Sequence, residues 1–127
     1  MCIRDRYVSD IGINAMMPKT ELPIHIDTGP FEWSLNIPVY SFTDSNISFY
    51  KTEETPVLKR VKNNSHITYL GFESENTMTP YKEISGDSAM LLNVRKPHKV
   101  TNFGNKTRIM ILIRLKNSFD IKNYLDK

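Results

Sequence analysis

The chain has 127 residues, of which 39% are hydrophobic and 24% are charged, and its formal net charge is +3. This length leaves room for one domain with a modest core, and the composition is that of a globular protein rather than a disordered or fibrous chain. The basic residues are scattered, so the weak positive charge indicates a solvated surface and argues against a nucleic-acid interface.

The apolar runs and the cysteine content bear on the compartment. The longest strongly apolar run, residues 109–113, is far shorter than the roughly 18 to 20 residues of a membrane-spanning helix, and no charged leader precedes an apolar signal segment. The single cysteine, Cys2, can form neither an internal disulfide nor a metal-thiolate cluster. We therefore expect a cytoplasmic protein with no membrane segment.

The first six residues, MCIRDR, resemble a sequence that recurs at the start of translated metagenomic fragments, where adapter read-through can produce it. We expect residues 1–6 to be foreign to the protein and the chain to be an amino-terminally shortened piece. Residues 1–19 are then an amino-terminal segment, with Met16 and Met17 as apolar filling. Residues 20–116 form the expected domain, and residues 117–127 form a tail or a short helix.

Clusters of Gly, Pro, Asn, Asp and Ser divide the sequence into short apolar runs. Most runs are too short for helices, and several are rich in β-branched or aromatic residues, which predicts strands. The predicted strands are residues 22–27, 34–40, 47–51, 67–72, 89–94, 98–103 and 107–115. Their spacing predicts an all-β sandwich or barrel, for which we expect a double-stranded β-helix of the jelly-roll or cupin-like type. Residues 53–65 and 73–88 are predicted to be long, mobile loops that determine substrate selectivity.

The last predicted strand has apolar residues on both faces. Its odd-numbered residues from 109 to 115 share one face, and its even-numbered residues from 108 to 114 share the other. This pattern predicts a strand near the centre of a sheet, covered on both sides. Pro23 and Pro38 lie within predicted strands, which places them at sheet edges or bulges.

Two of the three histidines lie in informative surroundings, Pro-Ile-His25-Ile-Asp27 and Lys-Pro-His98. Residues two apart in a strand point the same way, so His25 and Asp27 can face one metal ion. His98 begins another predicted strand, which a jelly roll can bring alongside. Two imidazoles and one carboxylate on one face of an octahedron leave three positions open, an arrangement that suits non-haem iron(II). Alone, however, a His-x-Asp pair is more often a pair of ordinary strand residues than a metal site.

Arg108 follows His98 by ten residues, and its planar guanidinium suits a carboxylate. Its direction depends on the turn between the last two predicted strands. A three-residue hairpin loop over residues 103–105 sets Arg108 opposite Val100, on the same face as His98, whereas a two-residue loop points it away.

The combined pattern of His25, Asp27, His98 and Arg108 resembles that of the 2-oxoglutarate and iron(II)-dependent oxygenase superfamily. The segments HIDTGPFEWSLNIPVY and PHKVTNFGNKTRIMILIRL are similar to small bacterial and phage members, and the resemblance covers about residues 20–116.

This resemblance implies that iron(II) and 2-oxoglutarate bind together, with the distal carboxylate of 2-oxoglutarate on Arg108. Reaction with dioxygen would release succinate and carbon dioxide and hydroxylate an unknown substrate. Asn36 and Tyr40 share a strand face and are candidates to contact the cosubstrate, although structural hydrogen bonding is an equal alternative.

Two other functional classes stay open. One is a cupin-like metal enzyme or sugar-binding module that does not use 2-oxoglutarate, and the other is a metal-free jelly roll whose two histidines and aspartate do not converge. Arg108 distinguishes the first alternative, because such proteins have no general need for a buried arginine beyond the metal. Trp33 and Tyr50 are expected to pack, and His66 to be a surface histidine.

Overall fold

The computed structural model describes residues 7–41, 43–61 and 64–117, with the backbone alone for residues 64 and 65. Its regular elements are strands, apart from one short 3-10 helix, η1. In chain order they are β1 (Val8–Met16), β2 (Thr20–Ile26), β3 (Phe31–Tyr40), β4 (Ser45–Tyr50), β5 (Val57–Val61), β6 (Asn64–Gly71), η1 (Glu75–Thr77), β7 (Pro80–Ser85), β8 (Met90–Asn93), β9 (His98–Asn102) and β10 (Arg108–Lys116).

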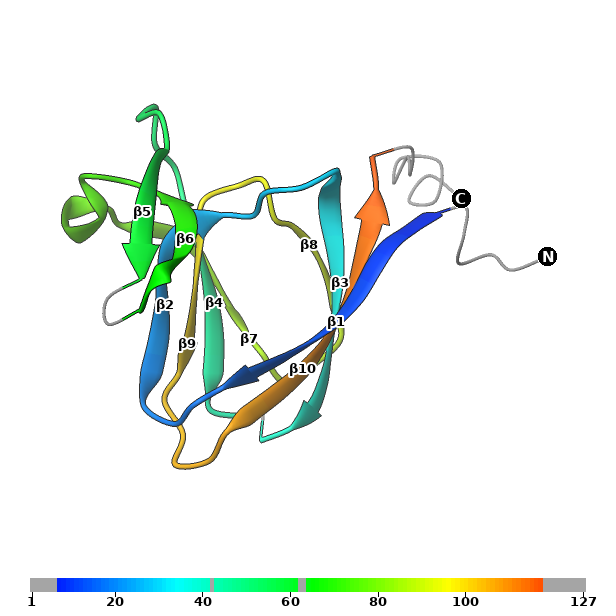
Figure 1. Ribbon diagram of the computed structural model, residues 1–127. Coiled ribbons are helices and arrows are strands. Elements are labelled where there is room, and N and C mark those ends of the chain that lie inside the picture. Colours follow the sequence, from blue (N-terminus) through cyan, green and yellow to red (C-terminus); the bar gives the residue numbers. More distant parts are fainter. Residues whose placement is uncertain (1–6, 42, 62–63, 118–127) are drawn as a thin grey trace.

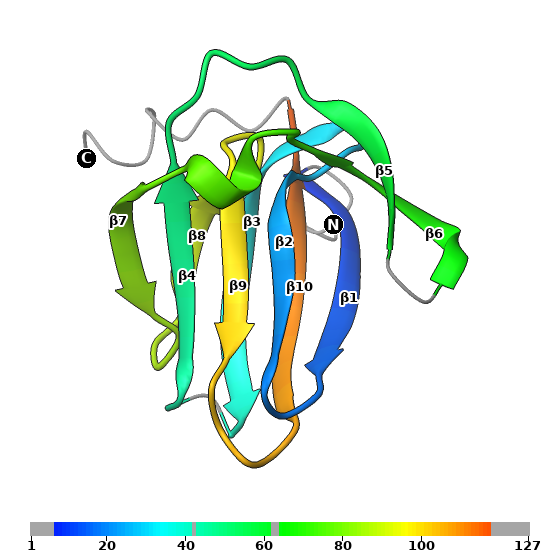
Figure 2. The same cartoon turned by 90° about the vertical axis from the view of Figure 1, so that its left-hand side faces the viewer.

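The strands form two antiparallel sheets that face each other (Figure 1). One sheet has the order β1-β10-β3-β8, and the other has the order β5-β6-β2-β9-β4-β7. Figure 2 shows β7, β4, β9 and β2 side by side, with strands of the other sheet behind them. The chain passes from one sheet to the other at each connection from β1 to β4 and from β7 to β10, as in a jelly roll, whereas β4, β5, β6 and β7 follow one another within the six-stranded sheet. The predicted all-β, double-stranded β-helix is therefore confirmed.

All seven strands expected from the sequence are present, and three further strands were not expected. β1 lies within residues 1–19, and β5 and β7 lie within the two stretches predicted to be loops, so that prediction is wrong for both. β7 pairs with β4 alone, at the edge of its sheet, and most of its side chains are exposed. An edge strand with polar side chains shows little hydrophobic periodicity, so the sequence pattern does not predict β7 as a strand. The expected terminal helix and the adapter-like residues 1–6 lie outside the described residues.

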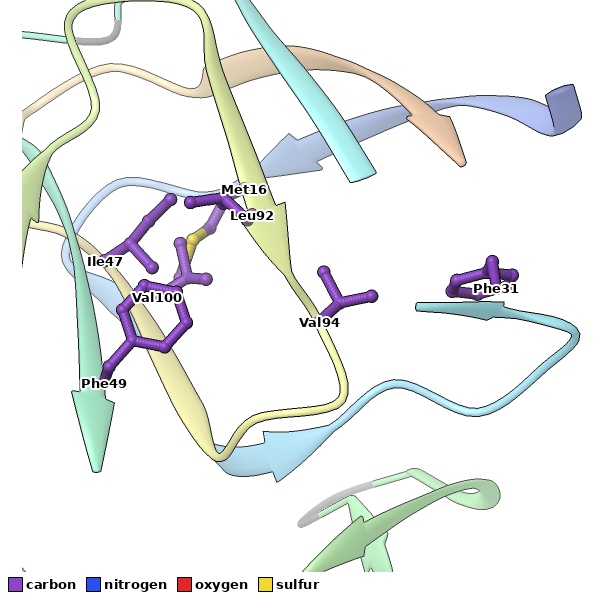
Figure 3. Close-up of a cluster of buried hydrophobic side chains, with 7 residues drawn as sticks. All are labelled: Met16, Phe31, Ile47, Phe49, Leu92, Val94 and Val100. Carbon is purple, nitrogen blue, oxygen red and sulfur yellow. The ribbon is translucent and has the colours of Figure 1, made fainter. Parts of the chain in front are cut away.

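The main core lies between the two sheets (Figure 3). It is built from Met16, Phe31, Ile47, Phe49, Leu92, Val94 and Val100. Burial of each such side chain contributes on the order of 1.5 to 3 kcal/mol. A second cluster of Ile24, Tyr50 and Phe72 packs on the other face of the six-stranded sheet. The sheet that supplies the candidate ligands is thus anchored on both faces.

β10 lies between β1 and β3, as its apolar pattern predicted. On its inner face Arg108 and Met110 are 2% and 0% exposed. Its outer residues are only half-buried, and the neighbouring Ile11 and Ile13 of β1 are 54% and 76% exposed. Within the described part of the chain, the expectation that β10 is covered on both sides is therefore wrong for the outer face.

Both strand prolines lie at irregularities, as expected. The pairing of β2 with β9 shifts register between Leu22 and His25, around Pro23, and the pairing of β3 with β10 shifts just after Pro38. A bulge tolerates the missing N–H of proline.

The described residues include no helix with the length and hydropathy that crossing a membrane requires.

Candidate metal centre

The bulge in β2 turns His25 into the space between the sheets. Leu22 and His25 both line the inner cavity, whereas Pro23 and Ile24 line a hollow on the outer face. In a regular strand, residues three apart point to opposite faces, so the extra residue of the bulge is what re-aims His25. The Pro-Ile-His sequence thus sets the direction of the first candidate ligand.

His98 lies directly opposite His25 on the neighbouring strand β9. Their ring centroids are 4.4 Å apart, and the rings are tilted by 51°. The Nδ1 atom of His25 is 2.7 Å from the carbonyl oxygen of Pro23, and that of His98 is 2.8 Å from the carbonyl oxygen of Lys96. Because a carbonyl can only accept, Nδ1 of each ring carries the proton, and each Nε2 lone pair is free for a metal.

Asp27 follows the last residue of β2, where its backbone N–H donates to the carbonyl of Val94 at 2.9 Å. Its Oδ1 atom lies 3.4 Å from Nε2 of His25 and 3.6 Å from Nε2 of His98. Ligand atoms about 2.1 Å from one ion lie roughly 3 to 3.5 Å apart. The three side chains could therefore hold a single metal ion.

The electrostatics keep these groups in the forms that bind metals. Burial alone would raise the pKa of Asp27, but a hydrogen bond from His25 and the positive charges of His98 and His25, both acting when the imidazoles are doubly protonated, together with the charge of Arg114 outweigh it, and the pKa lies below its usual value. Burial, with the nearby His25, lowers the pKa of His98. A carboxylate and a neutral imidazole result, and these are the protonation states required for metal binding.

Arg108 lines the same cavity, but the connection between β9 and β10 that brings it there differs from the one predicted from the sequence. β9 and β10 belong to different sheets, so the expected hairpin and the pairing of Arg108 with Val100 are wrong; Arg108 pairs with Met16 of β1. The buried Asn102 accounts for this crossing. Its Nδ2 atom donates to the carbonyls of Met16, Met17 and Lys106 at 2.9 to 3.1 Å, and its Oδ1 atom accepts from the N–H of Gly104 at 3.0 Å.

The Arg108 side chain is 2% exposed, and it forms no ion pair with any described residue. Its Nε and NH1 atoms are buried without a hydrogen-bond partner. Burial lowers the pKa of this guanidinium. Leaving a buried donor unsatisfied costs about 1 to 3 kcal/mol, more for a charged group, so this arrangement is costly without a ligand.

One cavity of about 170 Å³ contains both Arg108 and the triad. A single water needs roughly 10 to 15 Å³, whereas clefts for drug-sized ligands usually span about 300 to 1,000 Å³. The volume therefore suits a small ligand. The lining residues are Asn14, Leu22, His25, Asp27, Ser34, Asn36, Ile47, Leu92, Val94, His98, Val100, Arg108, Leu112 and Arg114.

Of the two weaker cosubstrate candidates, the structure brings only Asn36 to the cavity, where its Oδ1 atom accepts from the hydroxyl of Ser34 at 2.8 Å. Tyr40 is 49% exposed and lines a separate hollow beside Asp44 and Lys106. The bulge after Pro38 breaks the alternation that would have placed Tyr40 on the same face as Asn36.

None of the other residues considered from the sequence lines the cavity; they are Trp33, Tyr50, His66, Met16 and Met17. Tyr50 packs with Ile24 and Phe72 as expected, and Trp33 is half-buried on β3 without lining the cavity. His66 is exposed, which agrees with a surface histidine. Met16 is in the core, but Met17 is 64% exposed, so only half of the Met-Met prediction is confirmed.

Sequence reasoning missed three of the polar residues that line the cavity, Asn14, Ser34 and Arg114. The alternation in β10 already placed Arg114 on the face of Arg108, so that signal was present in the sequence. Asn14 gave no comparable signal, because β1 was not predicted.

Comparison of the chain with protein-family models, with curated protein sequences and with solved structures finds no match.

Proposed function

We propose that the chain is an iron(II)- and 2-oxoglutarate-dependent dioxygenase that hydroxylates a small substrate and releases succinate and carbon dioxide. The observation that carries the proposal is Arg108, a buried and unpaired guanidinium in the same small cavity as His25, Asp27 and His98. A metal site alone is compatible with many activities. A metal site that shares its cavity with an unsatisfied cation favours a ligand with two acidic ends.

The donor set fits iron(II). Two neutral imidazoles and one carboxylate are the usual protein ligands of non-haem iron oxygenases, and they leave coordination positions for a cosubstrate and dioxygen. The hydrogen bonds from Nδ1 to the carbonyls of Pro23 and Lys96 hold both imidazoles in the tautomer that the metal needs. A closed tetrahedral zinc shell would require a fourth ligand, and the described residues form only this group of three.

The separation between Arg108 and the triad fits a short dicarboxylate. Asn102 hydrogen-bonds Met16, the pairing partner of Arg108, and lies four residues along β9 from His98. At a rise of about 3.3 Å per residue, the end of the cavity at Arg108 lies roughly 13 Å from the end at His98, measured along β9. An extended arginine side chain and a bound five-carbon diacid can together cover that distance.

Each group of the chain then has a defined task. When bound, iron(II) and 2-oxoglutarate supply the oxidative chemistry that yields succinate, carbon dioxide and a hydroxylated substrate. His25, Asp27 and His98 hold the metal at the end of β2 and the start of β9, both parts of a rigid sheet. Arg108 neutralises and orients the distal carboxylate, and the surrounding Ile47, Val100 and Leu112 exclude water from it.

Neither alternative accounts for Arg108. A cupin-like metal enzyme or sugar-binding module without 2-oxoglutarate has no use for an unpaired, buried guanidinium beyond its metal. A metal-free jelly roll would not need His25, Asp27 and His98 to converge, yet their ligand atoms all lie within 4.8 Å of one another.

The test is the visible spectrum of the protein under anaerobic conditions. Addition of iron(II) and then 2-oxoglutarate to wild-type protein should produce a metal-to-ligand charge-transfer band that neither component gives alone. Folded protein that binds iron(II) but develops no such band on addition of 2-oxoglutarate would overturn the proposed function. The Asp27→Ala variant should fail to develop the band because it lacks the ligand set.

A further inference from the structure

A second arginine lines the cavity at the end opposite Arg108. Arg114 lies six residues further along β10, on the same inner face, and it lines the cavity together with His25 and Asp27. Its charge is also one of the influences that lower the pKa of Asp27. Arg114 therefore lies at the metal end of the cavity, where a substrate would have to bind.

Arg114 is held in place by three neighbours. Its NH1 atom donates to Oδ1 of Asp10 at 2.7 Å, and its guanidinium carbon lies 5.3 Å from the centre of the Phe31 ring. Gly12 leaves room for it, because a Cβ atom there would lie 3.3 Å from NH1. A glycine inside a strand weakens the strand and often marks a close approach of this kind. The position of Arg114 is thus fixed without occupying all its hydrogen-bonding groups.

The Arg114–Asp10 pair remains open to a ligand. The two side chains are 26% and 49% exposed. In the described part of the chain, Asp10 is the ion-pair partner of Arg114, and Nε of Arg114 is buried without a partner. A guanidinium has five N–H donors, so one bond to Asp10 leaves capacity for a carboxylate. Asp10 likewise has room to accept from a second cation.

The charges at this end of the cavity select the kind of ligand. Arg114 lines the cavity as a positive group, and Asp10, its exposed ion-pair partner on β1, places a negative group beside it just outside the lining residues. Asp27 adds a further carboxylate that a bound metal would neutralise. A simple anion would meet the repulsion of Asp10, and a simple cation that of Arg114. A zwitterion whose two charges are separated by a few atoms complements both.

From this juxtaposition we propose that Arg114 and Asp10 bind the α-carboxylate and α-ammonium groups of a free amino acid, which is the primary substrate. The inference rests on the proposed function, because it needs a metal and 2-oxoglutarate in the remainder of the cavity. The Arg114–Asp10 pair positions the substrate, and the amino-acid side chain faces His25, Asp27 and His98. Arg108 stays reserved for the cosubstrate at the other end.

The test measures binding rather than turnover. Zn(II)-loaded protein, saturated with 2-oxoglutarate, is titrated with each of the common L-amino acids, and chemical shifts of ¹⁵N-labelled protein are followed. We expect at least one amino acid to bind in saturable fashion. Its N-acetyl and carboxamide derivatives, which each lack one charge, should bind at least about tenfold more weakly, since each loses a charge-assisted hydrogen bond.

Variants separate this site from the cosubstrate site. Arg114→Gln and Asp10→Asn should each weaken amino-acid binding at least about tenfold while the Kd for 2-oxoglutarate changes less than about threefold. Lys82→Gln, at an exposed cation of β7 outside the cavity, should change neither Kd. If Arg114→Gln does not fold, Asp10→Asn and the blocked derivatives decide the question on their own.

Three results would overturn the inference while leaving the proposed function in place. One is 2-oxoglutarate binding with no amino acid bound by the wild-type protein. Another is equal binding of the free amino acid and its blocked derivatives, and the third is equal binding by the wild type and Asp10→Asn. By contrast, failure of 2-oxoglutarate to bind metal-loaded wild-type protein would overturn the proposed function itself.

Discussion

Replacing Arg108 by methionine should stabilise the ligand-free protein and abolish cosubstrate binding. The Nε and NH1 atoms of Arg108 are buried without partners, and each unsatisfied donor costs about 1 to 3 kcal/mol. Methionine fills most of the same volume without burying a charge. After allowing for lost packing, we expect the free energy of unfolding to rise by about 1 to 3 kcal/mol.

The same substitution should have the opposite effect on binding. Two charge-assisted hydrogen bonds to a carboxylate contribute about 1.5 to 3 kcal/mol each, so their loss should raise the Kd for 2-oxoglutarate by at least about 100-fold. Urea denaturation of metal-loaded protein without 2-oxoglutarate measures the first effect, and calorimetric titration of 2-oxoglutarate measures the second. Metal affinity should be largely unchanged, because Arg108 is not a ligand.

Arg95→Met provides a matched control. Nε of Arg95 donates to the carbonyl of Phe31 at 2.9 Å, and its NH2 atom donates to that of Gly29, so its loss should destabilise the fold and leave 2-oxoglutarate binding unchanged. A destabilised Arg108→Met protein with an unaltered Kd for 2-oxoglutarate would mean that Arg108 is a structural residue, and the reasoning would be refuted.

Three further perturbations test other parts of the account. Asn102→Ala should lower the free energy of unfolding by about 3 kcal/mol in urea denaturation, because three carbonyls and one N–H lose their partner, whereas the exposed Asn105→Ala should change it by less than about 0.5 kcal/mol. His98 has a lowered pKa, so the unfolded metal-free chain binds more protons, and stability should fall as the pH drops below roughly 6.5. In His98→Gln that slope should be smaller, and an unchanged slope would show that another group causes it. Asp27→Ala should abolish iron-dependent formation of succinate, measured by chromatography, and retained succinate would mean that the ligand set is misassigned.

Most of the fold could be predicted from the sequence, because most strands show alternating polar and apolar residues or contain runs of β-branched residues. The strands that were missed had no such signal. β7 is a polar edge strand, and β1 exposes Ile11 and Ile13 on one face while presenting Gly12 and Asn14 on the other, so its pattern does not indicate a buried core. Hydrophobic periodicity reports burial, and strands with little burial on either face escape it.

The sequence predicted which residues lie together at the candidate site, but it did not predict how the fold brings them together. His25 and Asp27 were paired by their spacing, yet the direction of His25 depends on a bulge at Pro23 whose type the sequence does not specify. Arg108 was placed on the correct face by an incorrect route, a hairpin where the chain instead crosses between sheets. The crossing is stabilised by the Asn102 side chain, whose hydrogen bonds to Lys106 and Gly104 are local but whose bonds to Met16 and Met17 join segments far apart in the chain, which no local pattern indicates.

The most direct measurement is a structure of the protein crystallised anaerobically with Mn(II) and 2-oxoglutarate. The metal should lie on His25, Asp27 and His98, and one carboxylate of 2-oxoglutarate should lie within hydrogen-bonding distance of the Nε and NH1 atoms of Arg108. A metal bound elsewhere, or 2-oxoglutarate outside the cavity with Arg108 still unpaired, would contradict it.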